Sequence, residues 1–165
     1  MAVLCPPHLA EQWQRELDIN LKGAFLACKH AIPSMLAQGK GVVTNISSVA
    51  AVRYTGYPYA SYYAAKGAVN QFTVGIALQY ARQGLRANAI MPGLMDTPMA
   101  MTGIAAATGK SADALRAERN ARVPMGHMGS AWDTAFAALF LCSDEARFIT
   151  GAVLPVDGGT SISIG

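Results

Sequence analysis

Apolar residues recur every three or four positions along the first part of the chain. The stripe that they form consists of Trp13, Leu17, Leu21, Phe25, Cys28, Ile32 and Met35. Residues at this spacing lie on one face of an α-helix, so the pattern predicts a helix over residues 9–37. Pro33 lies inside that range and has no backbone N–H, so we expect it to kink or end the helix.

Three short apolar runs are instead typical of β-strands. They cover residues 41–47, 85–91 and 151–156. The first run is uncharged and rich in β-branched residues, which favours a strand buried on both faces of a parallel sheet. The second run is followed by Pro92 and Gly93, and the third by a glycine-containing turn, which are typical endings of strands.

Helical spacing returns over residues 61–83. One apolar face of this segment is formed by Ala65, Val69, Phe72, Ile76 and Tyr80. The preceding residues 49–60 contain Gly56 and Pro58, and we predict that they form a loop.

The segment 94–125, which follows the second predicted strand, is rich in Met, Ala, Gly and Thr. Within it we predict one helix over residues 111–121. Ser130, with Asp133 three residues later, predicts the start of a last helix that ends near Ser143. Helices that alternate with strands imply right-handed crossovers and a parallel α/β sheet. Three strands are fewer than the five or six of an average sheet, so we expect an incomplete sheet.

The composition excludes several classes of protein. Apolar residues make up 52% of the 165 residues and charged residues 14%, which excludes a disordered chain and fits one domain. The thirteen Lys and Arg residues are scattered, so no basic stripe predicts nucleic-acid binding. Three cysteines without a Cys-x-x-Cys pair argue against a disulfide framework, and we expect no metal site. No apolar run is long enough to span a membrane and no signal-peptide pattern is present, so we expect a cytoplasmic protein without a membrane partner.

Tyr62 and Lys66 are four residues apart on a predicted helix, so their side chains share one face. A nearby ammonium favours the phenolate and lowers the pKa of a tyrosine. A tyrosine tuned in this way can exchange a proton with an alcohol or carbonyl oxygen. The alternative interpretation is a solvated helix face on which the lysine stem covers an aromatic ring.

Ser47 and Ser48 end the first predicted strand. Ligands of open α/β sheets bind beyond the carboxyl ends of the strands, where the Ser48 hydroxyl can donate a hydrogen bond to a substrate oxygen. The alternative for Ser48 is a turn or cap serine, which is a common use of this residue.

Five blocks of the sequence resemble the short-chain dehydrogenases/reductases. They are Asp18-Ile-Asn20-Leu-x-Gly23, Asn45-Ile-Ser-Ser48, Tyr62-x-x-x-Lys66, Pro92-Gly93-x-x-x-Thr97, and Ile149-Thr-Gly151 followed by Val156-Asp-Gly-Gly159. The resemblance runs from about Trp13 to Gly159. It implies a Rossmann-like, doubly wound parallel sheet.

The resemblance implies four catalytic residues. Tyr62 matches the acid/base of the family, and Ser48, in preference to Ser47, matches the serine that orients and polarises the substrate oxygen. Lys66 matches the lysine that lowers the tyrosine pKa and binds the ribose hydroxyls of the nicotinamide nucleotide. Asn20 matches the asparagine that supports a proton-relay water. Without the resemblance, the alternative for Asn20 is a helix-interior residue bonded to the backbone.

The cofactor that the resemblance implies is NAD or NADP. The residues implied in binding it are Tyr62, Lys66, Pro92, Gly93, Met95 and Thr97. The implied reaction is hydride transfer between the nicotinamide and a secondary alcohol or ketone, whose identity stays open. The resemblance also implies a homodimer or homotetramer, with the helices predicted over residues 9–37 and 61–83 at the subunit contact.

The chain departs from the family at its start. Family members open with a strand, a glycine-rich turn and a helix that bind the pyrophosphate, and no such glycine cluster precedes Asn20. We therefore interpret residues 1–165 as one partial Rossmann-like domain, truncated at its N-terminus, whose strand 41–47 is an open edge. The chain alone is expected not to turn over substrate. The alternative is an inactive fragment that acts only in self-association or association with relatives.

Overall fold

The strands run in parallel through the middle of the computed structural model, which describes residues 8–163. They are β1 (Gly41–Ile46), β2 (Leu85–Pro92) and β3 (Val153–Val156), in the order β1-β2-β3. The helices are α1 (His8–Leu17), α2 (Gly23–Ala37), α3 (Ala60–Tyr80), α4 (Pro98–Thr108), α5 (Ala112–Ala121) and α6 (Ala131–Cys142). The predicted parallel α/β architecture is confirmed.

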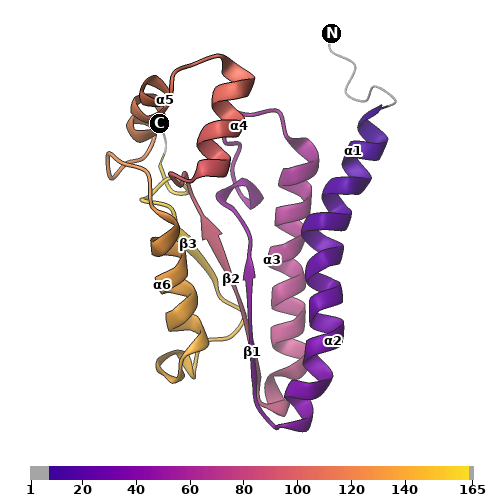
Figure 1. Cartoon of the computed structure of the whole chain (residues 1–165). Helices are drawn as coiled ribbons and strands as arrows, with labels where there is room; N and C mark the ends of the chain where they lie inside the picture. The colour runs from indigo at the N-terminus through magenta and orange to yellow at the C-terminus, as the bar shows by residue number, and fades with distance from the viewer. Residues whose placement is uncertain (1–7, 164–165) are drawn as a thin grey trace.

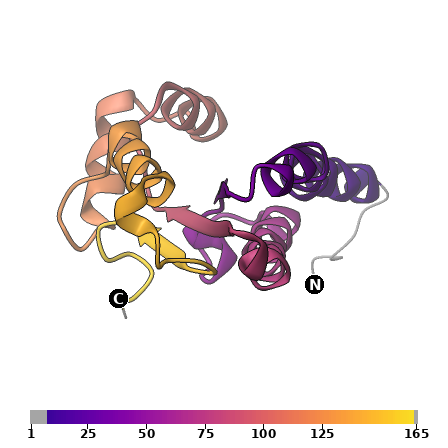
Figure 2. The same ribbon diagram turned by 90° about the horizontal axis from the view of Figure 1, so that it is seen from below.

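Helices cover both faces of the sheet, as in a doubly wound fold. Figure 2 shows α2 and α3 on one face and α6 on the other. Alternate residues of β2 point to opposite faces, so Ala87 packs against the α2–α3 layer while Arg86 reaches the α6 side. There the Arg86 Nη1 donates to the Leu141 carbonyl at the end of α6 (2.9 Å). The core of the α2–α3 layer contains Cys28, Ile32, Ile76, Ala77, Leu85 and Ala87.

β1 differs from the prediction of a strand buried on both faces. Its residues are half-buried and Ile46 is 47% exposed, whereas the interior of β2 is almost completely buried. The physical reason is the strand order: β1 pairs with β2 along one side only, so within residues 8–163 it is an edge of the sheet. The expectation that this strand forms an open edge is confirmed.

The predicted first helix is present but is divided at a different place. A π-helical turn, Asp18–Lys22, joins α1 to α2. Pro33 does not end the helix, because α2 continues through it to Ala37. The apolar stripe is also covered unevenly: Cys28 and Ile32 are buried, whereas Trp13 is 44% exposed.

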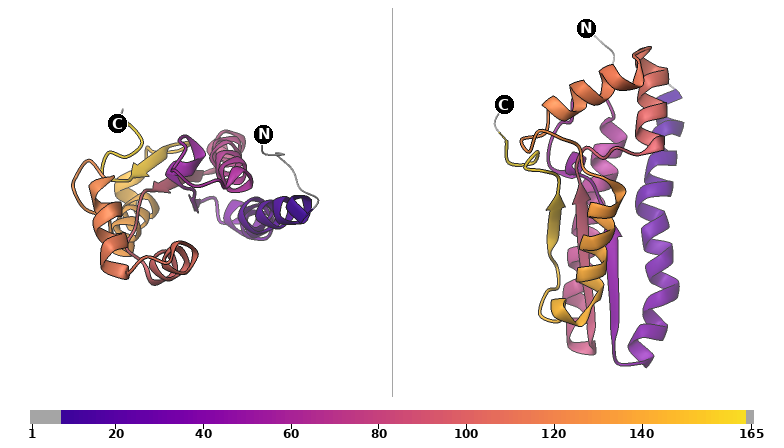
Figure 3. Two further views of the ribbon diagram at one scale, coloured as in Figure 1. Left: turned by 90° about the horizontal axis from the view of Figure 1, so that it is seen from above. Right: turned by 60° about the vertical axis from the view of Figure 1, so that its left-hand side comes forward.

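The region after β2 contains a helix that the sequence analysis missed. α4 begins at Pro98, and the Thr97 hydroxyl caps it by accepting from the Ala100 N–H (3.3 Å). The predicted α5 and α6 are confirmed, and Ser130 caps α6 with Asp133 as predicted. The right-hand view in Figure 3 places α4 and α5 at one end of the molecule, and Figure 1 shows the β1 and β2 arrows pointing toward that end.

Candidate active site

Three of the predicted site residues lie close together where β1 ends and α3 begins. Ser48 follows the carboxyl end of β1, and Tyr62 and Lys66 lie in the first two turns of α3. Asn20 lies in the π-helical turn, on the helix that packs against α3. Chain segments that are distant in sequence thus bring these residues to one edge of the sheet, as Figure 1 shows for the elements that carry them.

The two serines have different environments. The buried Ser47 hydroxyl donates to the Lys66 carbonyl (3.1 Å) and fixes the strand to α3. Ser48 is half-buried, and its Oγ accepts from the Ala50 N–H (3.1 Å). The Ser48 hydroxyl also lies near enough to the Tyr62 phenol to lower the pKa of that phenol. Of the two serines, Ser48 is the one that acts on the pKa of the proposed acid/base, which agrees with the preference for Ser48 over Ser47.

The pKa of the Tyr62 phenol is shifted in the direction opposite to the prediction. Burial raises the pKa of its phenol, the hydrogen bond with Ser48 lowers it in part, and the negative charge of Glu16 raises it further. The Lys66 Nζ lies 5.6 Å from the centre of the Tyr62 ring and donates to the Ile46 carbonyl (3.0 Å). The expected lowering by Lys66 is therefore wrong for this structure, because burial dominates and the ammonium is bound to a carbonyl.

Lys66 is itself perturbed. Burial lowers the pKa of its ammonium, and the charge of Glu16 acts in the opposite direction. Among residues 8–163, no carboxylate forms an ion pair with this ammonium. Lys66 therefore keeps hydrogen-bond donors for a further polar group.

Asn20 is tied to its own helix. Its Nδ2 donates to the Glu16 carbonyl (3.1 Å) and to the Glu16 Oε2 (2.8 Å). Asn20 is thus a helix residue bonded to the backbone, as the alternative interpretation expects, and it also lies on a segment that packs against α3. Glu16 was missed by the sequence analysis. Residues four apart on a helix are neighbours, so its position four residues before Asn20 could have predicted the contact.

The predicted cofactor loop lies at the carboxyl end of β2. Gly93 N–H donates to the Val156 carbonyl (2.9 Å), which joins the loop to the end of β3. A Cβ at Gly93 would lie 2.7 Å from the Asp157 Cα, so only glycine fits this close approach of two backbones. Met95 forms an isolated parallel bridge with Gly129. Thr97 caps α4, so it has a structural role in addition to the cofactor contact that the resemblance implies.

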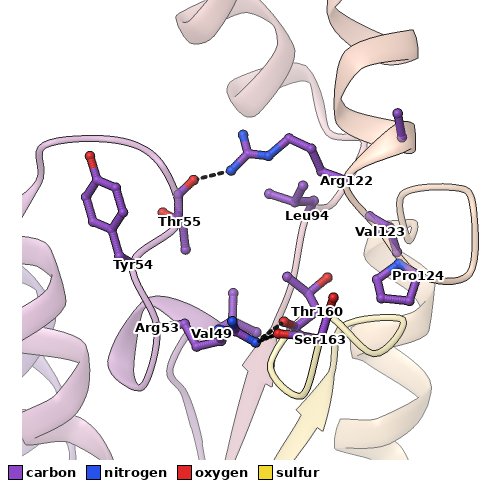
Figure 4. A pocket seen from close by; sticks show the side chains of 11 residues that line it. Val49, Arg53, Tyr54, Thr55, Leu94, Arg122, Val123, Pro124, Thr160 and Ser163 are labelled. Carbon is purple, nitrogen blue, oxygen red and sulfur yellow. Dashed lines mark hydrogen bonds between the residues drawn. The ribbon is translucent and has the colours of Figure 1, made fainter. Parts of the chain in front are cut away.

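A cavity of about 430 Å³ lies next to these residues. Figure 4 shows Arg122 reaching toward Thr55 at one side of the cavity and Arg53 reaching toward Thr160 and Ser163 at the other. Its lining residues are Val49, Arg53, Tyr54, Thr55, Leu94, Ala121, Arg122, Val123, Pro124, Thr160 and Ser163. None of the four proposed catalytic residues lines it, so we do not identify it with the reaction site. Its two arginines were also missed, because they are distant in sequence.

Two features are absent from residues 8–163, a membrane-spanning helix and a cluster of metal ligands. No helix in this part of the chain is both long and apolar enough to cross a membrane. Nor do these residues contain a group of three His, Cys, Asp or Glu side chains arranged to hold a metal ion.

Comparison with known proteins identifies the family. The model described as "Enoyl-(Acyl carrier protein) reductase" matches residues 8–161. The chain is 38% identical over 149 residues to 2-(R)-hydroxypropyl-CoM dehydrogenase of Xanthobacter autotrophicus, covering 90% of this chain and 56% of the relative. It is 41% identical over 155 residues to 3beta-hydroxysteroid dehydrogenase 1 of Eggerthella lenta, covering 92% and 56%.

A solved structure supports the same assignment. The crystal structure of a short-chain dehydrogenase/reductase from Burkholderia xenovorans superposes with a TM-score of 0.89 at 45% identity, covering 94% of this chain and 59% of that one. The chain thus spans little more than half the length of the relatives that it matches. The sequence blocks, the Rossmann-like sheet and these matches agree that the chain belongs to the short-chain dehydrogenase/reductase family.

Proposed function

We propose that this chain carries the catalytic half of an NAD(P)-dependent oxidoreductase that interconverts a secondary alcohol and a ketone. The observation that carries the proposal is the meeting of Ser48, Tyr62 and Lys66 at the carboxyl edge of the sheet, beside the loop that begins at Pro92. Side chains from two segments, the end of β1 and α3, converge there on the position where open α/β sheets bind their ligands.

Each side chain has a distinct task in the proposed reaction. The Tyr62 phenol moves the proton to or from the substrate oxygen, and the Ser48 hydroxyl orients that oxygen. Burial raises the pKa of Tyr62, so the phenol is protonated at neutral pH and holds the proton that reduction of a ketone requires. Asn20 supports a water on the route by which the proton is exchanged with solvent.

The residues near this edge fit the nicotinamide end of NAD or NADP. When bound, the cofactor supplies the hydride or accepts it. Lys66 suits the ribose hydroxyls, because its bond to a carbonyl leaves an unneutralised ammonium with free donors. Tyr62 adjoins the same site, and the close packing of Gly93 on Asp157 holds the loop at the strand ends. The residues proposed to contact the cofactor are Tyr62, Lys66, Pro92, Gly93, Met95 and Thr97.

We further propose that residues 1–165 act as one partial Rossmann-like domain in a cytoplasmic homodimer or homotetramer. Trp13, Ile19 and Phe25 on the first helix pair are 44%, 61% and 47% exposed, and α3 exposes Leu78. Burial of these side chains against another copy stabilises the assembly through the hydrophobic effect. The proposed partners are otherwise a small alcohol or ketone, with neither nucleic acid nor membrane.

The test of the proposed chemistry is Tyr62→Phe in the protein expressed from its complete reading frame. This variant removes the proton and keeps the ring, so turnover of a ketone panel with NADH and NADPH should fall at least about 10²-fold. Tyr59→Phe, three residues earlier at an exposed position, is the matched control and should retain activity. Turnover of Tyr62→Phe within about twofold of the parent would exclude Tyr62 as the acid/base.

The second candidate function is association without catalysis. It is favoured by the outer face of α6, where Trp132, Phe136 and Leu139 are 69%, 63% and 69% exposed at helical spacing. Turnover by the complete protein separates the candidates, whereas a fluorescence titration of the 165-residue chain with NADH and NADPH tests the chain alone. We expect no saturable binding below about 100 μM by the chain alone, because remote binding energy holds the reacting atoms. An active complete protein then supports the enzyme, and an inactive one supports association.

A further inference from the structure

The side-chain amide of Asn20 is held by a single residue, Glu16. The Asn20 Nδ2 donates to the Glu16 backbone carbonyl (3.1 Å) and to the carboxylate Oε2 (2.8 Å). An amide nitrogen is a donor only, and both acceptors that Nδ2 contacts belong to Glu16. Both partners are acceptors, which fixes the orientation of the amide with Nδ2 toward Glu16. The Oδ1 of Asn20 is an acceptor, so any hydrogen bond that it forms must be donated to it.

Glu16 also stands close to the residues of α3. It lies in the last turn of α1, one turn before Asn20, and α1 packs directly against α3. Its side chain is half-buried, and within residues 8–163 it forms no ion pair with a lysine or arginine. Its negative charge adds to the rise in the pKa of Tyr62, and it opposes the lowering of the pKa of Lys66 by burial. A carboxylate without an ion-pair partner among residues 8–163 therefore lies on the helix that packs against the helix of the proposed acid/base.

We propose that Glu16 is a positioning residue of this site, which fixes the orientation of the Asn20 amide and keeps a negative charge beside the Tyr62–Lys66 pair. The inference rests on the proposed function in so far as it assigns this pair to proton transfer. The groups that face Tyr62 are then Glu16 from α1, Lys66 from its own helix and the Ser48 hydroxyl from the segment after β1.

The consequence for the reaction follows from the sign of the charge. A carboxylate near a phenol favours the neutral phenol, and near an ammonium it favours the charged form. Glu16 thus keeps Tyr62 protonated and Lys66 cationic, which suits proton donation to a ketone oxygen. A water at the Asn20 Oδ1 must donate to it, so the water's lone pairs remain free to accept a proton from the site.

The test measures the ionisation of Tyr62 without turnover. The six tyrosines are labelled with ¹³C at Cζ, and the Tyr62 resonance is assigned by its loss in Tyr62→Phe. Glu16→Gln keeps the shape and removes the charge, so the titration midpoint of Tyr62 should move to lower pH. Glu11→Gln, at an exposed position of the same helix, is the matched control and should leave the midpoint unchanged. A midpoint in Glu16→Gln equal to or higher than that of the parent overturns the proposal.

A second measurement uses the unmutated chain, so it does not depend on the folding of a variant. In an acid titration followed by ¹⁵N–¹H spectra, the Asn20 side-chain amide protons should shift as a carboxylate is protonated. An Asn20 amide that does not respond overturns the proposal. If Tyr62→Phe leaves turnover unchanged while both spectroscopic results are as expected, the proposed function is refuted. The placement of Glu16 beside Asn20 and Tyr62 then still holds.

Discussion

Replacing Ser48 by alanine separates the chemical role of this hydroxyl from its structural role. The Ser48 Oγ accepts one backbone hydrogen bond, from the Ala50 N–H at 3.1 Å. Loss of such a cap costs about 0.5–2 kcal/mol. At roughly 2–4 °C per kcal/mol, the melting temperature should fall by about 1–8 °C. Loss of a donor to the reacting oxygen should lower turnover far more, by about 10²–10³-fold.

The Ser48→Ala variant should also shift the pH dependence. Hydrogen bonding with Ser48 lowers the pKa of Tyr62, so its removal raises that pKa further. Alcohol oxidation needs the phenolate, so its rising limb should move to higher pH. Ketone reduction uses the protonated phenol, so its falling limb should also move to higher pH. Both limbs are read from kcat/KM between pH 6 and about 10, in the complete protein.

Ser47→Ala is the matched control for this experiment. It removes the bond from the buried Ser47 hydroxyl to the Lys66 carbonyl and should cost about 1 kcal/mol of stability. It should leave the pH limbs in place, because Ser47 does not contact Tyr62. Equal losses of turnover in the two variants, or a Ser48→Ala enzyme within about twofold of the parent, would refute the assignment of Ser48.

Two further predictions concern stability and assembly. Gly93→Ala should destabilise the chain by about 1–3 kcal/mol in urea unfolding, because the new Cβ would lie 2.7 Å from Asp157. The control is Gly75→Ala in α3, where a new Cβ meets no atom of another segment within 4 Å, and it should be neutral or stabilising. Equal urea midpoints of the two variants would contradict this prediction. Sedimentation of the chain at micromolar concentration should give a dimer or larger species, and Leu26→Lys on the exposed side of α2 should give a monomer. A monomeric parent would refute the proposed contact.

The features that could be predicted from the sequence have local signals. The start of α6 depends on Ser130 and Asp133, three residues apart, and the structure contains that capping box. α4 was missed because its residues are apolar or small on every side, so no periodic face distinguishes it. The π-helical turn at Asp18–Lys22 is hidden for a related reason, since the apolar spacing of three and four continues through it.

The electrostatics of the site depend on tertiary structure, and the sequence carries little of this information. The spacing of Tyr62 and Lys66 predicted their proximity, which the structure shows. The pKa of the phenol depends on burial by segments distant in sequence and on Glu16 across a helix contact, neither of which the spacing contains. The sequence therefore predicted that Tyr62 and Lys66 lie close together, but it did not predict the direction in which the pKa of Tyr62 is shifted.

The edge position of β1 determines how Ser48 is held. The Gly41 and Ser47 amides both donate to carbonyls next to or within β2, at 3.2 Å and 2.7 Å, so the odd-numbered amides of this strand face β2. In a parallel strand the even-numbered amides then point along the free edge, where they exchange with solvent hydrogen more readily. Any segment that pairs with this edge would protect those amides and restrain a strand that ends two residues before Ser48. Order at the proposed reaction site is thereby coupled to what occupies the free edge of the sheet.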